Sequence, residues 1–202
     1  NASFYELMKQ WYLWYDTIPE VNPHQYDNPL TLLEAIKYER DQWSYITSYA
    51  AFQQYYEEGA YIGYGFGYKW DSSDSLRISF VFEDSPLKKK HVERGWVITQ
   101  VNGNVITPSD NLSSILGAEQ VGVENQFEFK THKGEKVTGT FAKKEISMNT
   151  VLMDTVIHYD NKNIGYFVLK SFINKTNDEV TEVFRHFDEK NIDDLVIDLR
   201  YN

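Results

Sequence analysis

The sequence lacks cysteine, contains only five prolines, and has no apolar run near the roughly 18 to 20 residues that span a bilayer. The absence of cysteine excludes disulfide bonds, a thiol nucleophile and zinc–thiolate sites. Basic residues are also outnumbered, because 20 lysines and arginines stand against 30 aspartates and glutamates, which leaves a net charge of −10. Such a chain repels phosphate backbones, so we do not expect nucleic acid as a partner.

Aromatic residues are plentiful, at 16% of the chain, and hydrophobic residues make up 42%. Aromatic side chains can stack on sugars, but they more often build cores and interfaces, which we take as the main explanation. A length of 202 residues suits two or three domains. The five histidines are scattered without the spacing of metal ligands, so we predict no metal site and no cofactor.

Residues 1–60 carry apolar residues at helical spacing, so we expect an aromatic-rich helical domain there. Ser3 and Glu6 have the spacing of a capping box at the start of a first helix. Pro19 ends that helix region, and Asn28 followed by Pro29 suits the start of a second helix. The opening residues therefore form a helical pattern rather than a signal peptide.

Residues 61–145 change to the alternating period of strands. Asn102-Gly103 and Lys133-Gly134 are turn pairs between predicted strands, and short helices are expected after Ser85-Pro86 and around Leu112. The pattern predicts a small, partly open barrel of short strands with two short helices. Its expected strands lie at residues 76–82, 97–101, 127–130 and 137–141.

Residues 146–202 have the pattern of a parallel β-α-β unit with a right-handed crossover. Residues 164–169 and 195–200 are apolar runs typical of buried strands. Between them, Thr176 and Glu179 have capping-box spacing ahead of an apolar helical stripe.

The stretch Tyr61–Tyr68 alternates glycine with apolar residues and admits two interpretations. Glycine at every second position bares one face, which allows either tight packing against another segment or presentation of backbone N–H groups to an anion. The spacing Gly-x-Gly-x-Gly does not match the dinucleotide-binding fingerprint.

Several motifs in a fixed order carry a family resemblance. Gly63-Tyr64-Gly65-Phe66-Gly67, then Ser85-Pro86, Glu93–Ile98 and Val101-Asn102-Gly103 resemble a PDZ domain of the bacterial, permuted type. In particular, the order is similar to that of the C-terminal-processing, or tail-specific, serine peptidases. Trp96 departs from the family pattern, in which many relatives carry aspartate after that glycine.

Other parts of the chain resemble the same family. The segments IGYFVLKSF and LVIDLRYN look like the opening of its peptidase core, and residues 14–19 and 41–46 resemble the leader region of Bacteroidetes-type members. The resemblance implies an α+β multidomain protein. Its expected parts are an N-terminal helical domain (1–60), a PDZ domain (61–145) and the first β-α-β unit of an α/β, crotonase-like peptidase core (146–202).

The family is understood to cut peptides near their C-termini with a serine nucleophile and a lysine base. The resemblance implies that both lie C-terminal to Asn202, so we expect no catalytic residue in this chain and no activity from it alone. Ser171 and Lys175 have the spacing of a Ser-Lys pair on a helix, but Ser171 falls at a strand end and Lys175 in a turn, so a non-catalytic interpretation is preferred.

The resemblance also implies a peptide-binding site, in which a substrate adds as a strand and its terminal carboxylate meets loop N–H groups. The residues that match this role are Tyr64, Gly65, Phe66 and Gly67, with Leu112 and Ile115 as walls of the pocket for the last side chain. We therefore expect the substrate-recognition part of a serine endopeptidase that acts on peptide or protein C-termini. The alternative is a non-catalytic peptide-binding adaptor. The family implies a periplasmic or cell-envelope location, with a lipid anchor upstream.

Overall fold

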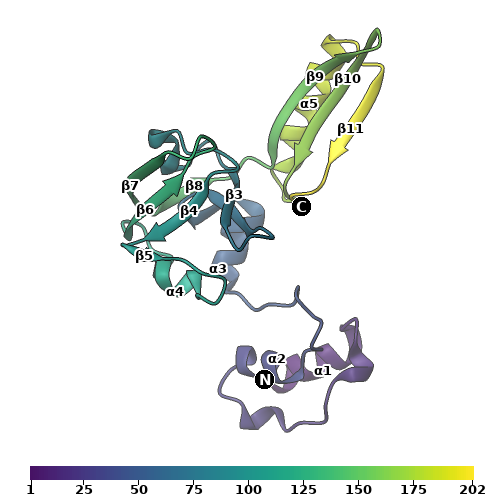
Figure 1. Ribbon diagram of the computed structural model, residues 1–202. Coiled ribbons are helices and arrows are strands. Elements are labelled where there is room, and N and C mark those ends of the chain that lie inside the picture. The colour runs from purple at the N-terminus through teal and green to yellow at the C-terminus, as the bar shows by residue number, and fades with distance from the viewer. The chain divides into compact units, whose positions relative to one another are not determined.

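The computed structural model describes residues 1–202, which form two compact units, Asn1–Tyr49 and Ala50–Asn202. Figure 1 traces the order of their helices and strands along the chain. None of the helices in residues 1–202 has the length and apolar content needed to cross a membrane.

The first unit is helical, with α1 (Ala2–Trp11) and α2 (Pro29–Ile36) joined through the short 3-10 helices η1 (Tyr15–Thr17) and η2 (Pro23–Gln25). α2 begins as predicted, because the Asn28 side chain accepts a hydrogen bond from the Thr31 backbone N–H and proline occupies the first helical position. The predicted capping box at Ser3 is wrong. α1 already begins at Ala2, so Ser3 lies inside its first turn.

A buried carboxylate organises the end of the first unit. Asp41 is only 5% exposed, and its Oδ2 accepts a hydrogen bond of 2.7 Å from the Tyr12 hydroxyl. Its Oδ1 accepts hydrogen bonds from the backbone N–H groups of Trp43 and Ser44, at 2.9 and 3.0 Å. This carboxylate therefore joins the end of α1 to the segment that follows α2.

The short helix α3 (Tyr49–Phe52) begins at the last residue of the first unit and continues into a π-helical turn of the second, η3 (Gln53–Glu57). An open, six-stranded antiparallel sheet follows, in the order β2-β3-β4-β6-β7, with β5 paired to β4. Its strands are β2 (Phe66–Trp70), β3 (Leu76–Val81), β4 (Val97–Val101), β5 (Asn104–Val105), β6 (Glu124–Lys130) and β7 (Lys136–Ala142). β2 and β7 are its edges, so the barrel is open, as the sequence predicted.

Turns and a core of aromatic rings shape this sheet. Asn102 and Gly103 both have positive φ angles, 52° and 79°, which explains the Asn-Gly pair between β4 and β5. Phe127 and Phe129 on β6 stack with centroids 5.7 Å apart, and both are fully buried. The two short helices lie at η4 (Pro86–Lys90) and α4 (Leu112–Leu116).

Two further sheets complete the second unit. β1 (Ala60–Gly63) pairs antiparallel with β8 (Lys144–Ser147). In the last sheet, β10 (Lys162–Leu169) pairs antiparallel with β9 (Val151–Tyr159) and parallel with β11 (Asp194–Asp198). The helix α5 (Thr176–Glu189) covers one face of this sheet (Figure 1), where Val183 and Phe187 pack against Phe167 and Leu169.

The predicted β-α-β unit is therefore confirmed as β10-α5-β11, and the mixed α and β architecture with several sheets is as expected. β8 and β9 were not predicted. The predicted capping box at Thr176 and Glu179 is wrong, because Lys175 is the cap residue and both side chains bond elsewhere.

Candidate functional site

The first candidate site is the free edge of β2. This strand pairs with β3 on one side only, so its other edge has no partner strand in residues 1–202. Tyr68 and Lys69 are exposed along it. An exposed edge carries unpaired N–H and C=O groups with the spacing that an extended peptide needs. β2 can therefore accept another strand.

The loop that leads into β2 is held by Ser85. Its hydroxyl donates a hydrogen bond of 2.6 Å to the Tyr64 carbonyl, while the Gly65 carbonyl accepts one of 2.9 Å from the Phe82 N–H. Gly65 has φ +73°, and a Cβ at this position would lie 2.8 Å from the Ser85 Cβ. Only glycine fits this conformation without displacing Ser85.

Tyr61 lies against the same loop. Burial raises the pKa of the Tyr61 hydroxyl, and a hydrogen bond from the Gly65 backbone opposes that shift. Its ring also covers Gly63, where a Cβ would meet it at 2.5 Å. The tyrosine that opens the glycine stretch thus folds back onto the loop, a contact that the alternating pattern did not predict.

Among the predicted site residues, Gly67 lies at a close contact between strands, whereas the apolar side chains lie in or against one core cluster. Gly67 lies opposite Phe80, whose ring fills the space a Cβ would take, so this glycine serves packing between β2 and β3. Tyr64 is 4% exposed, and its hydroxyl donates to the Val123 carbonyl and accepts from Asn125. The four predicted apolar side chains share one core cluster, namely Tyr64, Phe66, Leu112 and Ile115.

Leu112 and Ile115 both belong to α4, yet they differ in exposure. Leu112 is 8% exposed, whereas Ile115 is half-buried and packs against the cluster from outside. α4 begins at Asn111, whose side chain accepts a hydrogen bond from the Ser114 N–H. Of the two predicted pocket walls, Ile115 is the more accessible.

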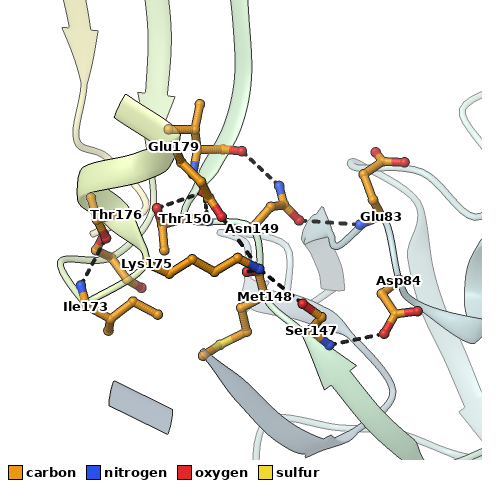
Figure 2. A network of polar contacts seen from close by, with 12 residues as sticks. Glu83, Asp84, Ser147, Met148, Asn149, Thr150, Ile173, Lys175, Thr176 and Glu179 are labelled. Carbon is orange, nitrogen blue, oxygen red and sulfur yellow. Dashed lines mark hydrogen bonds and ion pairs between the residues drawn. The ribbon is translucent and has the colours of Figure 1, made fainter. Parts of the chain in front are cut away.

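A polar network links the open sheet to the β-α-β unit, as Figure 2 shows. Glu179 on α5 accepts three hydrogen bonds at one carboxylate oxygen, from the Thr150 N–H, the Thr150 hydroxyl and the Val151 N–H, at 2.6 to 2.9 Å. Thr150 is 1% exposed, so these donors are removed from water. Glu179 therefore fixes the segment that connects β8 to β9.

Lys175 strengthens the same junction. Its Nζ donates to the Met148 carbonyl at 2.8 Å and to the Ser147 hydroxyl at 3.1 Å (Figure 2). Further along, the Ser147 N–H donates to Asp84 (Figure 2). Asp84 also forms an ion pair with Lys144. That ion pair lowers the pKa of Asp84. The sequence held no local signal for these contacts, since their partners lie far apart in the chain.

The structure does not bring Ser171 and Lys175 together. Ser171 follows β10 and receives a hydrogen bond of 2.9 Å from Lys170, its neighbour in sequence, while Lys175 bonds to Ser147 and Met148. The sequence-based preference for a non-catalytic role is consistent with this geometry.

The end of β11 carries a second compact polar group. The Asp198 carboxylate accepts hydrogen bonds from the Tyr166 hydroxyl and the Arg200 guanidinium, at 2.7 and 2.5 Å. The Arg200 guanidinium, with help from Tyr166, holds the pKa of Asp198 well below its usual range. Asp198 is 6% exposed, so this ion pair fixes the chain where it leaves the strand. Residues 1–202 contain no group of three or more metal-ligating side chains that could hold a metal ion.

Comparison with known proteins gives two family matches. Residues 1–45 match the peptidase S41 N-terminal domain, and residues 163–202 match peptidase family S41. None of the curated proteins matches the sequence.

Two solved structures share the fold. A protein assigned as an S41 protease from Bacteroides fragilis is 23% identical with a TM-score of 0.59, over 100% of this chain and 55% of that one. A photosystem II D1 C-terminal processing protease is 16% identical with a TM-score of 0.52, over 97% of this chain and 58% of that one. The chain thus spans less than two thirds of either protein.

Proposed function

The two family matches assign this chain to peptidase family S41, and we propose that it is the substrate-recognition part of a serine peptidase that processes protein C-termini. One observation carries the proposal. The segment between the two matches holds an open sheet whose edge strand β2 begins at a glycine loop, an arrangement suited to capturing a peptide. We propose that residues 61–145 of this segment form a PDZ domain and that residues 146–202 are the start of a crotonase-like core.

In this proposal the substrate adds to β2 as a further strand. In this proposal its terminal carboxylate lies at the loop of Tyr64 and Gly65, which turns sharply where Gly65 has φ +73°. The last side chain packs beside Ile115, which is half-buried on α4. Main-chain hydrogen bonds supply affinity, and the carboxylate supplies selectivity for chain ends.

Catalysis in this proposal belongs to residues beyond Asn202. A serine attacks the peptide carbonyl after a lysine has taken its proton, which requires a lysine whose pKa is lowered enough to be neutral. Residues 1–202 supply recognition and hold the incoming strand. The alternative is an adaptor that binds chain ends without cutting them. Hydrolysis of a bound peptide by the longer protein, and its loss with a serine-directed inhibitor, separates the two.

Titration with two peptides tests the recognition step. An apolar C-terminal peptide with a free carboxylate is expected to bind more tightly than its amidated form, measured by fluorescence anisotropy. Ile115→Lys should weaken binding of the free peptide, whereas Ser113→Lys, an exposed change on the same helix, should leave it unchanged. Equal affinity for both peptides contradicts the carboxylate mechanism.

We further propose a periplasmic or cell-envelope location, as the family resemblance implies. Fractionation of cells that produce the full-length protein tests this, and recovery in the cytosolic fraction alone contradicts it.

A further inference from the structure

Two cavities adjoin on the outer face of the open sheet. One, of about 570 Å³, extends from the β2–β3 turn to Tyr201; the other, of about 650 Å³, extends over β4 to the β6–β7 turn. They share Arg77, Gly95 and His132 in their linings. We call the combined hollow the cationic groove, because its charged lining residues are Lys69, Arg77, Arg94, Lys130, Lys133 and Arg200, with one acid, Asp71.

The charge of the groove is not neutralised within the chain. Asp71 is already paired with Arg77, at 2.6 Å, and Arg200 is paired with Asp198. The other cations form no ion pair, namely Lys69, Arg94, Lys130 and Lys133. Arg94 only lies over the Tyr201 ring, at 5.6 Å. A positive surface on a chain of net charge −10 is a site of charge complementarity for an acidic ligand.

The groove lies at one end of the strand that the peptide would join. In the register of β2 and β3, Lys69 lies opposite Arg77, and both side chains are exposed. The neighbouring residues Leu76 and Ile78 are buried on the opposite face of the sheet. A peptide whose carboxylate is at Gly65 must run antiparallel to β2, so its upstream residues reach Lys69. Lys69 lies three positions after Phe66 along β2, so the third to fifth residues before the chain end face the groove.

We propose that the cationic groove selects peptides with acidic side chains three to five residues before the C-terminus. This inference rests on the proposed binding of a peptide to β2, and it adds a second determinant to the apolar chain end. Side chains of a strand alternate between faces, so acids at the third and fifth positions point to the same side and reach Lys69 and Arg94 together.

Four peptides test the proposal with the 202-residue chain. All end in the same apolar residue; two carry glutamate and two glutamine at the third and fifth positions upstream, each with a free or amidated terminus. The free glutamate peptide is expected to bind about fivefold more tightly than the free glutamine peptide at low salt, since each exposed ion pair contributes modestly. The difference should shrink at about 0.3 M salt, where exposed charges are screened.

Charge reversal identifies the residues. Lys69→Glu combined with Arg94→Glu should abolish or invert the preference for glutamate, while the free glutamine peptide keeps its affinity. Lys89→Glu combined with Lys190→Glu is the matched control, because it changes the net charge equally at two exposed lysines outside the groove. Circular dichroism checks that both double variants fold.

The outcomes separate this inference from the proposed function. Preference for the free carboxylate without preference for glutamate contradicts the proposed selectivity of the cationic groove and leaves the proposed function intact. If the control double variant also loses the preference for glutamate, that preference depends on net charge. This result would likewise contradict a selective role of the cationic groove. If no free peptide binds more tightly than its amide, the proposed function fails together with the inference.

Discussion

At the scale of single residues, Gly65 combines two requirements that are usually separate. Its φ of +73° disfavours any side chain, and a Cβ would also lie 2.8 Å from Ser85. Gly103 has a similar φ of +79° but nothing within 4 Å of a Cβ, so a substitution there tests the cost of the backbone conformation alone.

We predict that Gly103→Ala lowers the free energy of unfolding by about 1 kcal/mol, the cost of the left-handed conformation. Gly65→Ala should cost about 2 to 4 kcal/mol, because Ser85 must also move. Urea unfolding followed by circular dichroism measures both. Equal costs for the two variants would show that the contact with Ser85 does not constrain the loop.

Asp41 in the first unit gives a prediction that depends on pH. Burial alone raises its pKa, but hydrogen bonds from Ser44 and Tyr12 outweigh burial and hold the pKa below its usual range. A carboxylate whose pKa is lower in the folded state stabilises that state above its unfolded pKa of about 3.9, and the stabilisation is lost as the pH falls below that value.

Asp41→Asn should therefore lower the opening free energy at the Trp43 and Ser44 amides by about 1 to 3 kcal/mol at pH 7. Near pH 3 the difference in opening free energy between Asp41→Asn and the unsubstituted chain should become smaller. Hydrogen exchange at the two pH values measures this. Tyr12→Phe, which removes one donor to the Asp41 carboxylate, should give a smaller loss of opening free energy. An undiminished difference at low pH would contradict the role of the charge.

At the scale of helices and strands, the sequence predicted what depends on near neighbours. The turn at Asn102-Gly103, the cap of α2 and the β10-α5-β11 unit all follow from local spacing. β8 and β9 escaped prediction because β8 pairs with β1, more than 80 residues away, and β9 shows no clean alternation.

The predicted capping box at Thr176 and Glu179 is wrong because of tertiary contacts. Thr176 donates to the Ser171 carbonyl and accepts from the Ile173 N–H, and Glu179 bonds to Thr150. Both side chains satisfy groups outside the helix, which spacing cannot reveal. For the candidate site, the sequence located the glycine loop and α4, but the packing of Gly67 on Phe80 depends on strand register.

The element α5 supplies a prediction about the junction between the open sheet and the β-α-β unit. Glu179→Ala leaves the donors of Thr150 and Val151 without their acceptor, at a cost of about 1 to 3 kcal/mol. Faster hydrogen exchange at those two amides is the expected signature. Glu182→Ala, an exposed change on the same helix, should leave them protected. Equal exchange in both variants would show that Glu179 does not hold the connection.

At the scale of the whole molecule, the last sheet leaves apolar surface uncovered. β11 is an edge strand, and Val196, Ile197 and Leu199 remain 46 to 48% exposed. On the helix side, Ile197 and Leu199 line an apolar hollow of about 580 Å³ with Phe172 and Phe184. Parallel strands with apolar residues on both faces are normally buried on both sides. This surface is therefore the part of the chain most prone to association.

We predict that the 202-residue chain self-associates through β11, in a manner that depends on its concentration. Ile197→Lys should weaken the association by about ten- to a hundredfold, because burying one isoleucine contributes roughly 1.5 to 3 kcal/mol and a charge cannot replace it. Val105→Lys is the matched control, since Val105 is 68% exposed on β5, and it should leave association unchanged. Sedimentation velocity measures the association of both variants.

A chain that remains monomeric at every concentration, or equal effects of the two substitutions, contradicts association through β11. Persistence of the association in both variants assigns it to another surface.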